Sequence, residues 1–238
     1  MQSVPSSLVH LSCSRCEQIY EADEIQRFCS CGGPLYPRYD LDHVHWTPED
    51  LASRPGGLWR YADLLPVRAD EHRLCLGEGG TPLLRLSRLG AHFGLDELLA
   101  KDEGLNPTGS FKARGLCMAV SRARELGIST LSIPTAGNAG SAMAAYCARG
   151  GMRAVIYVPA DTPPEFLTEY RDLGAQVTIV DGTISDAGAQ MAREAEDDWF
   201  PMSTLQEPYR LEGKKTMGLE LAEQLGWELP DVILYPTG

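Results

Sequence analysis

Strand and helix patterns alternate along the chain from about residue 98, and this alternation constrains the fold more than any other feature. Short apolar runs typical of buried strands occur at Leu98–Ala100, Thr130–Pro134, Ala154–Pro159, Gln176–Val180 and Val232–Tyr235. Helical patterns lie between them at Ala113–Leu126, Ser141–Arg149, Pro164–Leu173, Ser185–Glu196 and Leu211–Leu225. Strands that alternate with helices predict the α/β class, with a parallel sheet and right-handed crossovers.

The last predicted strand, Val232–Tyr235, is followed by only three residues. In this architecture a strand and a Gly-bearing turn normally lead into a helix. We therefore interpret the chain as a fragment of a longer protein. The sequence patterns divide the chain into a cysteine-bearing segment 1–42, an irregular arm 43–97, an α/β domain 98–205, and the incomplete start of a second α/β domain 206–238. Within the arm we expect short helices at Pro48–Ala52 and Trp59–Leu64.

The charge and the apolar patterning exclude two classes of partner. A net charge of -12 argues against nucleic-acid and anionic-membrane surfaces, because both require clustered Lys and Arg. No apolar run is long enough to cross a bilayer, and the N-terminal residues lack the pattern of a signal peptide. Seven cysteines, an odd number, do not indicate a secreted disulfide framework. We expect a cytoplasmic protein.

One lysine stands between a Pro- and Gly-rich turn and a helix, in the run Asn106–Gly115 (NPTGSFKARG). The backbone of Lys112 would be fixed by the turn while its amine reaches into a cleft. This arrangement suits a lysine that forms a Schiff base. A position near a helix N-terminus disfavours the ammonium and so helps to lower its pKa. The alternative is a solvated lysine in the first turn of a surface helix.

A second loop, Thr135–Gly140 (TAGNAG), connects a predicted strand to an alanine-rich helix. Such a turn presents free backbone N–H groups and the positive end of a helix dipole, so it suits a carboxylate or a phosphate. The amide of Asn138 can both donate and accept a hydrogen bond. The alternative is a tight turn with an ordinary helix cap.

Together these two loops resemble the tryptophan-synthase-β-like, fold-type II enzymes that use pyridoxal phosphate, and among them the threonine synthases. The resemblance covers roughly residues 75 to 238. It rests on motifs in matching order, which are Gly77–Leu83, Lys101–Glu103, Asn106–Lys112, Thr135–Gly140 and Pro208–Thr216. The fold that it implies is a three-layer α/β/α fold with a parallel central sheet.

The resemblance implies roles for particular residues. Lys112 would form the Schiff base with pyridoxal phosphate, and Asn138 would bind the 3′-oxygen of the cofactor. Thr237 and Gly238 would begin the loop that binds its phosphate. The substrate would be bound by Thr135, Ala136, Gly137 and Ala139, which receive its carboxylate, and by Thr108 and Ser110, which shape the turn that presents the lysine.

The reaction that the resemblance implies converts O-phospho-L-homoserine and water to L-threonine and phosphate. The partner is then a small amino-acid substrate, and a homodimer is the assembly common among such proteins. One residue departs from the pattern, because Ala113 stands where threonine synthases usually carry aspartate. Serine/threonine dehydratases and cysteate-synthase-type enzymes are therefore alternatives. A further alternative is a non-catalytic, truncated relative.

Four of the seven cysteines lie near the N-terminus, as Cys13-x-x-Cys16 and Cys29-x-Cys31. Four thiolates at such spacing can form a tetrahedral, structural zinc site in a zinc-ribbon-like segment. The spacing Cys29-x-Cys31 is one residue shorter than the usual pair. A degenerate ribbon held by packing alone is the alternative.

Overall fold

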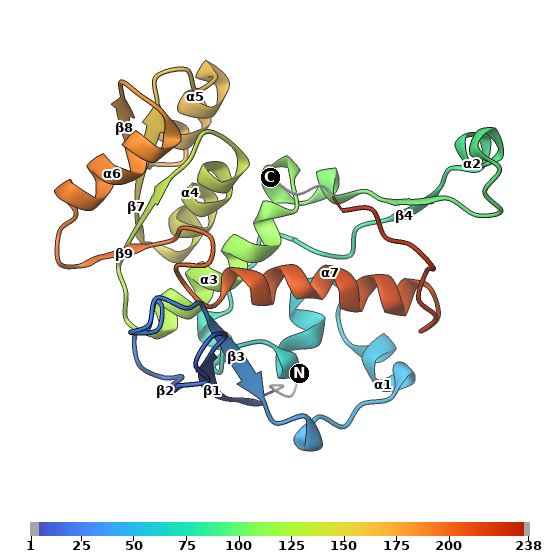
Figure 1. Ribbon diagram of the computed structural model, residues 1–238. Coiled ribbons are helices and arrows are strands. Elements are labelled where there is room, and N and C mark those ends of the chain that lie inside the picture. The colour runs from blue at the N-terminus through green and yellow to red at the C-terminus, as the bar shows by residue number, and fades with distance from the viewer. Residues whose placement is uncertain (1–4, 236–238) are drawn as a thin grey trace.

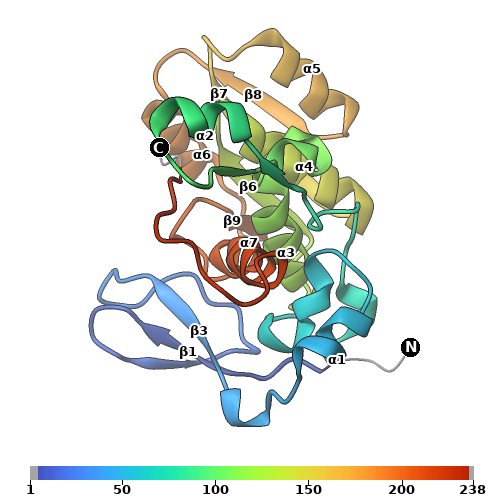
Figure 2. The ribbon, with the colours of Figure 1, turned by 90° about the vertical axis from the view of Figure 1, so that its right-hand side faces the viewer.

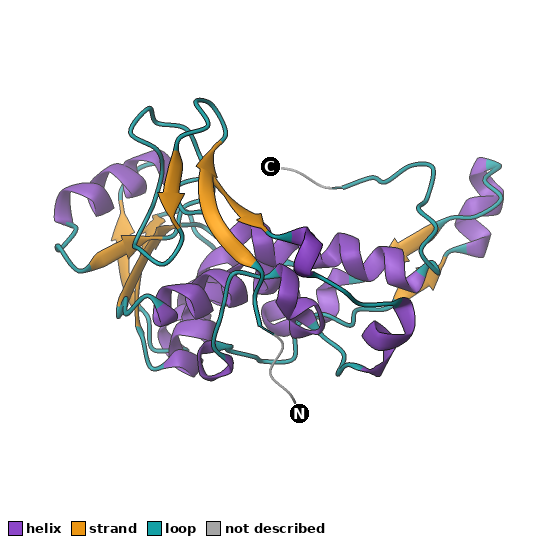
Figure 3. Ribbon diagram, turned by 90° about the horizontal axis from the view of Figure 1, so that it is seen from below, coloured by secondary structure: helices purple, strands orange, loops and turns teal. Residues whose placement is uncertain are grey.

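A computed structural model describes residues 5–235 of the chain. Its strands form three separate sheets, seen as three groups of arrows in Figure 3. The largest is a four-stranded parallel sheet in the order β8-β7-β6-β9. Its strands are β6 (Thr130–Pro134), β7 (Arg153–Pro159), β8 (Gln176–Val180) and β9 (Trp199–Pro201).

Helices cover both faces of this sheet. α4 (Asn138–Gly150) and α5 (Pro164–Asp172) lie on one face, and α6 (Ile184–Glu194) lies on the other (Figure 1). β7 is accordingly buried from Ala154 to Pro159, as expected for a parallel strand covered on both sides. The predicted α/β class and its three layers are confirmed, and β6 and β8 have the predicted bounds.

Two further helices extend the core beyond the sheet. α3 (Lys112–Glu125) lies between α4 and α7 (Arg210–Gln224), and its residues Ala113–Ala123 are all buried. The backbones of α3 and α7 approach closely at two glycines. A Cβ atom at Gly213 would lie only 2.0 Å from the carbonyl oxygen of Arg114, and one at Gly115 would lie 2.9 Å from that of Arg210. Only glycine allows this contact, which brings the first turns of the two helices together.

The cysteine-bearing segment forms a small antiparallel sheet in the order β2-β1-β3. Its strands are β1 (Leu8–Cys13), β2 (Ile19–Glu21) and β3 (Leu35–Tyr39). Figure 2 shows this sheet on one side of α7 and the parallel sheet on the other. After it come α1 (Pro48–Ser53) and a 3₁₀ helix at Leu58–Leu64, close to the two short helices that the sequence predicts.

The predicted strand at Leu98–Ala100 exists, but not in the parallel sheet. It is β5 (Leu99–Lys101), and it pairs antiparallel with β4 (Leu83–Arg85) in a two-stranded sheet. α2 (Ser87–Phe93) joins the two strands and projects from the body of the protein in Figure 1. The placement in the parallel sheet was wrong because the backbone of β5 pairs with β4, a nearby three-residue strand that has no periodic pattern of its own.

The predicted buried strand at Val232–Tyr235 is a second correction. These residues form no strand, and their side chains are 42–91% exposed. An apolar run becomes a strand only where a neighbouring strand accepts its backbone hydrogen bonds. No strand within residues 5–235 pairs with this one. The proposed division of the chain at residues 42, 97 and 205 stays a prediction.

Membrane-spanning helices were not expected from the sequence. Within residues 5–235, every helix is too short or too polar to span a bilayer.

Candidate functional site

A cleft of about 390 Å³ lies where the first residues of three helices meet. Lys112 begins α3, Asn138 begins α4 and Arg210 begins α7. The cleft is lined by Lys112, Ile133, Pro134, Thr135, Ala136, Gly137, Asn138, Ala139, Ile184, Ser203, Thr204 and Arg210. Three helix N-termini at one cleft supply backbone N–H donors and a positive local field.

Lys112 is half-buried and its amine lies over an aromatic ring. Its Nζ atom is 4.4 Å from the centroid of the Phe111 ring. Burial lowers the pKa of the Lys112 amine, and the positive charge of Arg210 lowers it further. Both causes favour the neutral amine, which is the form that attacks a carbonyl carbon.

The turn from β6 into α4 is held in place from both sides. The Gly137 N–H donates to Thr135 Oγ1 at 3.4 Å, and the Tyr170 hydroxyl donates to the Gly137 carbonyl at 2.7 Å. The side chain of Asn138 is exposed. The backbone of this turn is therefore fixed by hydrogen bonds. It presents the N-terminus of α4 and the side-chain amide of Asn138 to the cleft.

Arg210 is a buried cation at the same cleft. It is 3% exposed, and its Nη1 atom donates to the Met202 carbonyl at 2.6 Å. Its Nε atom is buried and has no hydrogen-bond partner within the described residues. Burial lowers the pKa of the Arg210 guanidinium, and Glu207 partly offsets this. A buried donor without a partner is the kind of group that an anionic ligand satisfies.

Glu207 lies fully buried just before α7. Its carboxylate accepts hydrogen bonds from the backbone N–H groups of Tyr209 and Arg210 at 2.7 and 3.0 Å. Burial nevertheless raises the pKa of Glu207 to about 7, while the charge of Arg210 opposes that change. The carboxyl group thus titrates close to neutral pH and adjoins the cationic wall of the cleft.

A buried ion network fixes the helix that carries Lys112. Arg114 is completely buried, and its guanidinium forms a bidentate pair with Glu103 at 2.7 and 2.8 Å. It also donates to Glu220 of α7 at 2.9 Å, and Glu220 pairs with Lys101 at 2.7 Å. The network joins the segment before the lysine turn, α3 and α7, so it sets where Lys112 enters the cleft.

The structure brings together most, but not all, of the site residues that the sequence predicts. Lys112 and the residues Thr135–Ala139 line one cleft. Ser110 does not line it, and its buried hydroxyl has no hydrogen-bond partner in the described part of the chain. Thr237 and Gly238 lie outside the described residues.

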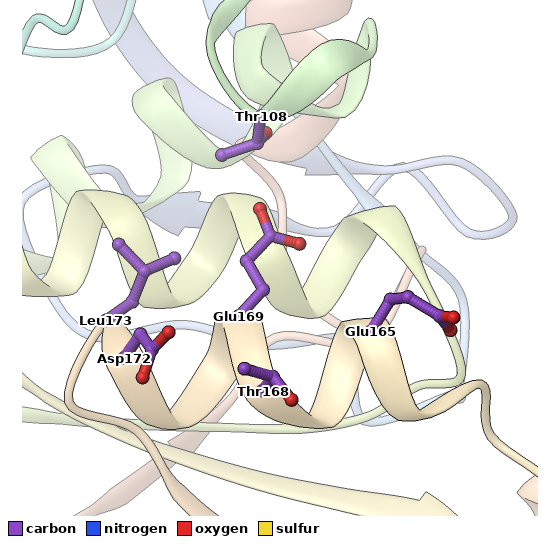
Figure 4. Close-up of a pocket in the computed structure, with 6 residues that line it drawn as sticks. All are labelled: Thr108, Glu165, Thr168, Glu169, Asp172 and Leu173. Carbon is purple, nitrogen blue, oxygen red and sulfur yellow. The ribbon is translucent and has the colours of Figure 1, made fainter.

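Thr108 faces a different hollow. Figure 4 shows it opposite α5, with the carboxylate of Glu169 pointing towards it. This open hollow is lined by Thr108, Glu165, Thr168, Glu169, Asp172 and Leu173. Thr108 has a positive φ of 59°, so the turn before Lys112 directs it away from the cleft. Its role towards the substrate stays a prediction.

Sequence reasoning missed part of the cleft wall. Arg210 lies in the motif Pro208–Thr216 but receives no role from the sequence, and Ile184, Ser203 and Thr204 carry no signal. One signal was present for Arg210, because it directly precedes the predicted helix Leu211–Leu225. Such a place disfavours an arginine unless its charge has a use.

The four N-terminal cysteines converge in space. The Sγ atoms of Cys13, Cys16, Cys29 and Cys31 all lie within 4.8 Å of one another. All four are free cysteines, two buried and two exposed. They lie at the end of β1 and in the turns of the cysteine-bearing segment, here called the ribbon, and not at the cleft. A metal there would not contact a substrate bound beside Lys112.

Comparison with protein families gives a match to most of the chain. A family model described as pyridoxal-phosphate dependent enzyme matches residues 74–238. The match includes every residue that lines the cleft, and it begins after the cysteine cluster.

Two archaeal relatives match nearly the whole chain. The threonine synthase of Methanocaldococcus jannaschii is 38% identical over 229 residues, which are 95% of this chain and 56% of that protein. The threonine synthase of Methanosarcina acetivorans is 37% identical over 233 residues, which are 97% of this chain and 57% of that protein. The chain thus spans somewhat more than half the length of these curated relatives.

A solved structure shares the fold. The apo form of diaminopropionate ammonia lyase from Escherichia coli aligns with a TM-score of 0.57 at 25% sequence identity. The alignment covers 65% of this chain and 50% of that one.

Proposed function

Because the chain belongs to the family of pyridoxal-phosphate dependent enzymes, we propose that it provides the cofactor lysine and one wall of the active site of a threonine synthase. The reaction would convert O-phospho-L-homoserine and water to L-threonine and phosphate. Both relatives described above carry the name threonine synthase. The observation that carries the proposal is the meeting of Lys112, the α4 N-terminus and Arg210 at one cleft.

The residues at the cleft fit pyridoxal phosphate. The cofactor carries an aldehyde, for which the half-buried Lys112 with its lowered pKa supplies an amine. Asn138 offers an exposed amide for the 3′-oxygen, and the buried Nε of Arg210 is a donor without a partner. When bound, the cofactor supplies an electron sink that stabilises a carbanion next to the substrate nitrogen.

The chain's own residues would bind the substrate and move its protons. The first turn of α4, from Asn138, offers N–H groups to the substrate carboxylate. The Lys112 amine would accept a proton from the α-carbon and return one later. Its lowered pKa increases the share of the neutral, proton-accepting amine at any given pH.

A phosphorylated substrate accounts for the cationic wall. Lys214 lies one turn beyond Arg210 on α7, although it does not line the cleft itself. Burial lowers the pKa of the Lys214 amine, the positive charges of Arg210 and Lys112 lower it further, and Glu207 opposes the change. Like charges gathered in a partly buried place are costly without an anion, and a phosphate dianion would relieve their repulsion.

Two measurements test the proposal. Pyridoxal phosphate added to the protein should give a visible absorbance band that Lys112→Ala removes, whereas Lys215→Ala retains it. Phosphate release from O-phospho-L-homoserine, with threonine formed in equal amount, should accompany the band. If the parent protein shows no band, this chain does not hold the cofactor as proposed; a band that persists in Lys112→Ala refutes the role of this lysine.

A serine/threonine dehydratase is the second candidate, and Ala113 favours it. The position where threonine synthases usually carry aspartate is fully buried here. An ionised carboxylate could not replace Ala113 without a buried partner. Formation of a 2-oxo acid from L-serine or L-threonine, without phosphate release from phosphohomoserine, would identify this activity. A cysteate-synthase-type enzyme would instead release phosphate from O-phospho-L-serine.

A further inference from the structure

The ribbon holds four thiols with the geometry of a metal site. The Sγ atoms of Cys13 and Cys31 are 3.5 Å apart, and so are those of Cys16 and Cys29. A tetrahedral zinc ion with bonds of about 2.3 Å requires sulfur atoms about 3.8 Å from one another. The observed pairs come within a few tenths of an ångström of that, and the whole set lies within 4.8 Å.

The surroundings of the thiols also fit a bound cation. The backbone N–H of Arg15 donates to Cys13 Sγ at 3.3 Å, and the Tyr20 hydroxyl donates to Cys29 Sγ at 3.1 Å. Such donors stabilise the negative charge on metal-bound thiolates. A Cβ atom at Gly33 would lie 2.6 Å from Cys13 Sγ, so the chain passes directly against the sulfur.

Leu8, Leu11 and Leu35 of this segment belong to the main hydrophobic core, but the sheet itself is small. Its strands contain three to six residues, and β2 has no buried residue. Small sheets of this kind usually depend on a metal or on disulfides, and all four cysteines are free. The family model that matches this chain begins at residue 74, so it assigns nothing to these cysteines.

The ribbon is attached to α3 and α7, two of the three helices that begin at the cleft. Tyr39 of β3 donates a hydrogen bond to Glu212 of α7 at 2.5 Å. The Ala22 carbonyl accepts hydrogen bonds from Arg122 of α3 at 2.7 Å and from the Tyr209 hydroxyl at 3.4 Å. Tyr209 directly precedes Arg210. The ribbon therefore contacts the first turn of α7 from the side opposite the parallel sheet (Figure 2).

We propose that Cys13, Cys16, Cys29 and Cys31 bind one zinc ion, and that the zinc-bound ribbon holds the first turn of α7 against the cleft. The ion takes no part in chemistry, because its four positions are filled by protein sulfur. Its effect reaches the cleft through Tyr39 and Ala22, which position the turn that carries Arg210. This proposal holds whichever substrate the cleft binds.

Metal analysis tests the first half of the proposal. The full chain, purified under reducing conditions and given Zn²⁺ before gel filtration, should retain one equivalent of zinc. Co²⁺ in its place should give the intense thiolate-to-cobalt absorption of a four-sulfur site. Cys31→Ser should lose most of the metal, whereas Cys75→Ser, an exposed cysteine outside the cluster, should keep it. Less than about half an equivalent in the parent, or equal loss in both variants, overturns the site.

Hydrogen exchange tests the second half without any cofactor or substrate. Removal of zinc by a chelator should speed amide exchange at least about tenfold in the ribbon and in residues 210–216 of α7. α6, which lies on the far face of the parallel sheet, is the internal control and should be unchanged. Tyr39→Phe should reproduce the effect in α7 while the zinc content stays at one equivalent. Unchanged exchange in residues 210–216 after zinc removal contradicts the attachment.

Discussion

Arg114 and Glu220 form a buried ion pair, 2.9 Å from Nη1 to the carboxylate, that joins α3 to α7. The guanidinium is fully buried and the carboxylate side chain is 7% exposed. Glu103 completes the coordination of the arginine from the segment before the lysine turn. Two residues before Arg114 stands Lys112, so this pair controls the position of the proposed cofactor lysine.

Replacing Arg114 should therefore unfold the protein more easily. Arg114→Met leaves the carboxylate of Glu103 without its cation and leaves Glu220 with Lys101 alone. Breaking a buried ion network in this way typically costs about 3–5 kcal/mol. Urea denaturation measures the change in the free energy of unfolding. The matched control is Arg85→Met, whose pair with Glu97 is 3.6 Å long and solvent-exposed. That variant should lose less than about 1 kcal/mol. Similar losses in the two variants would contradict a structural role for the network.

The charge of Arg210 should influence the proton affinity of Lys112. Burial and Arg210 both lower the pKa of the lysine amine. The amine reacts only when neutral, so attachment of pyridoxal phosphate should rise as the pH passes through that pKa. In Arg210→Met the pKa of Lys112 should rise, because the positive charge that helps to lower it is removed. The pH at which attachment is half-maximal (the midpoint) should therefore move upward.

The rate of attachment is measured by reduction with borohydride at a series of pH values, followed by mass spectrometry of the peptide that contains Lys112. Lys215→Met is the control, because that amine pairs with Glu212 and does not shift Lys112. Its midpoint should match the parent. A midpoint in Arg210→Met at or below the parental pH would show that the charge of Arg210 does not act on the amine.

The sequence predicted the elements that local patterns determine. The helical period from Ala113 to Leu126 located α3 within one residue at each end, and the β-branched and apolar run Thr130–Pro134 gave β6 its bounds. Both are long or strongly patterned and deeply buried, so local preference and tertiary packing agree. β9 escaped notice because a three-residue strand ending in proline has no detectable period.

Site residues divide in the same way. Lys112 and the Thr135–Gly140 turn were recognised because each lies in a motif that is continuous in sequence. Arg210 depends on how α7 crosses α3, which is set by the close approach of Gly115 and Gly213 and not by any local signal. The direction of Thr108 depends on a positive φ in the turn, which the sequence does not reveal for a non-glycine residue.

Glu207 should make the stability of the protein depend on pH. Its pKa in the folded state is raised by burial to about 7 from 4.5. The unfolded state therefore releases this proton first as the pH rises. The contribution of Glu207 to the free energy of unfolding is therefore fully present below about pH 4.5. It falls between pH 4.5 and 7 and is constant above that range. A shift of this size corresponds to a loss of about 3 kcal/mol.

Glu207→Gln removes the ionisation, so the variant should lose about 3 kcal/mol less than the parent between pH 4.5 and 8. Urea denaturation of both proteins at these two pH values measures the difference. The amide oxygen of glutamine can still accept from the N–H groups of Tyr209 and Arg210, so α7 keeps its start. If the free energy of unfolding changes with pH in the same way in both proteins, folding does not raise the pKa of Glu207.

Two glycines of α7 should respond in opposite ways to the same substitution. A Cβ atom at Gly213 would meet the Arg114 carbonyl at 2.0 Å, whereas one at Gly218 would meet no atom within 4 Å. Alanine is favoured over glycine in a helix by about 1 kcal/mol, so Gly218→Ala should stabilise the protein by up to that amount. Gly213→Ala gains the same preference but must push α7 away from α3, which should cost at least about 1–3 kcal/mol net. Denaturant unfolding compares the two variants.

Because the displacement would also move Arg210, Gly213→Ala should weaken pyridoxal-phosphate binding as well, while Gly218→Ala should leave it unchanged. Equal stability of the two variants would mean that the helices can separate without loss, and that their contact does not set the width of the cleft.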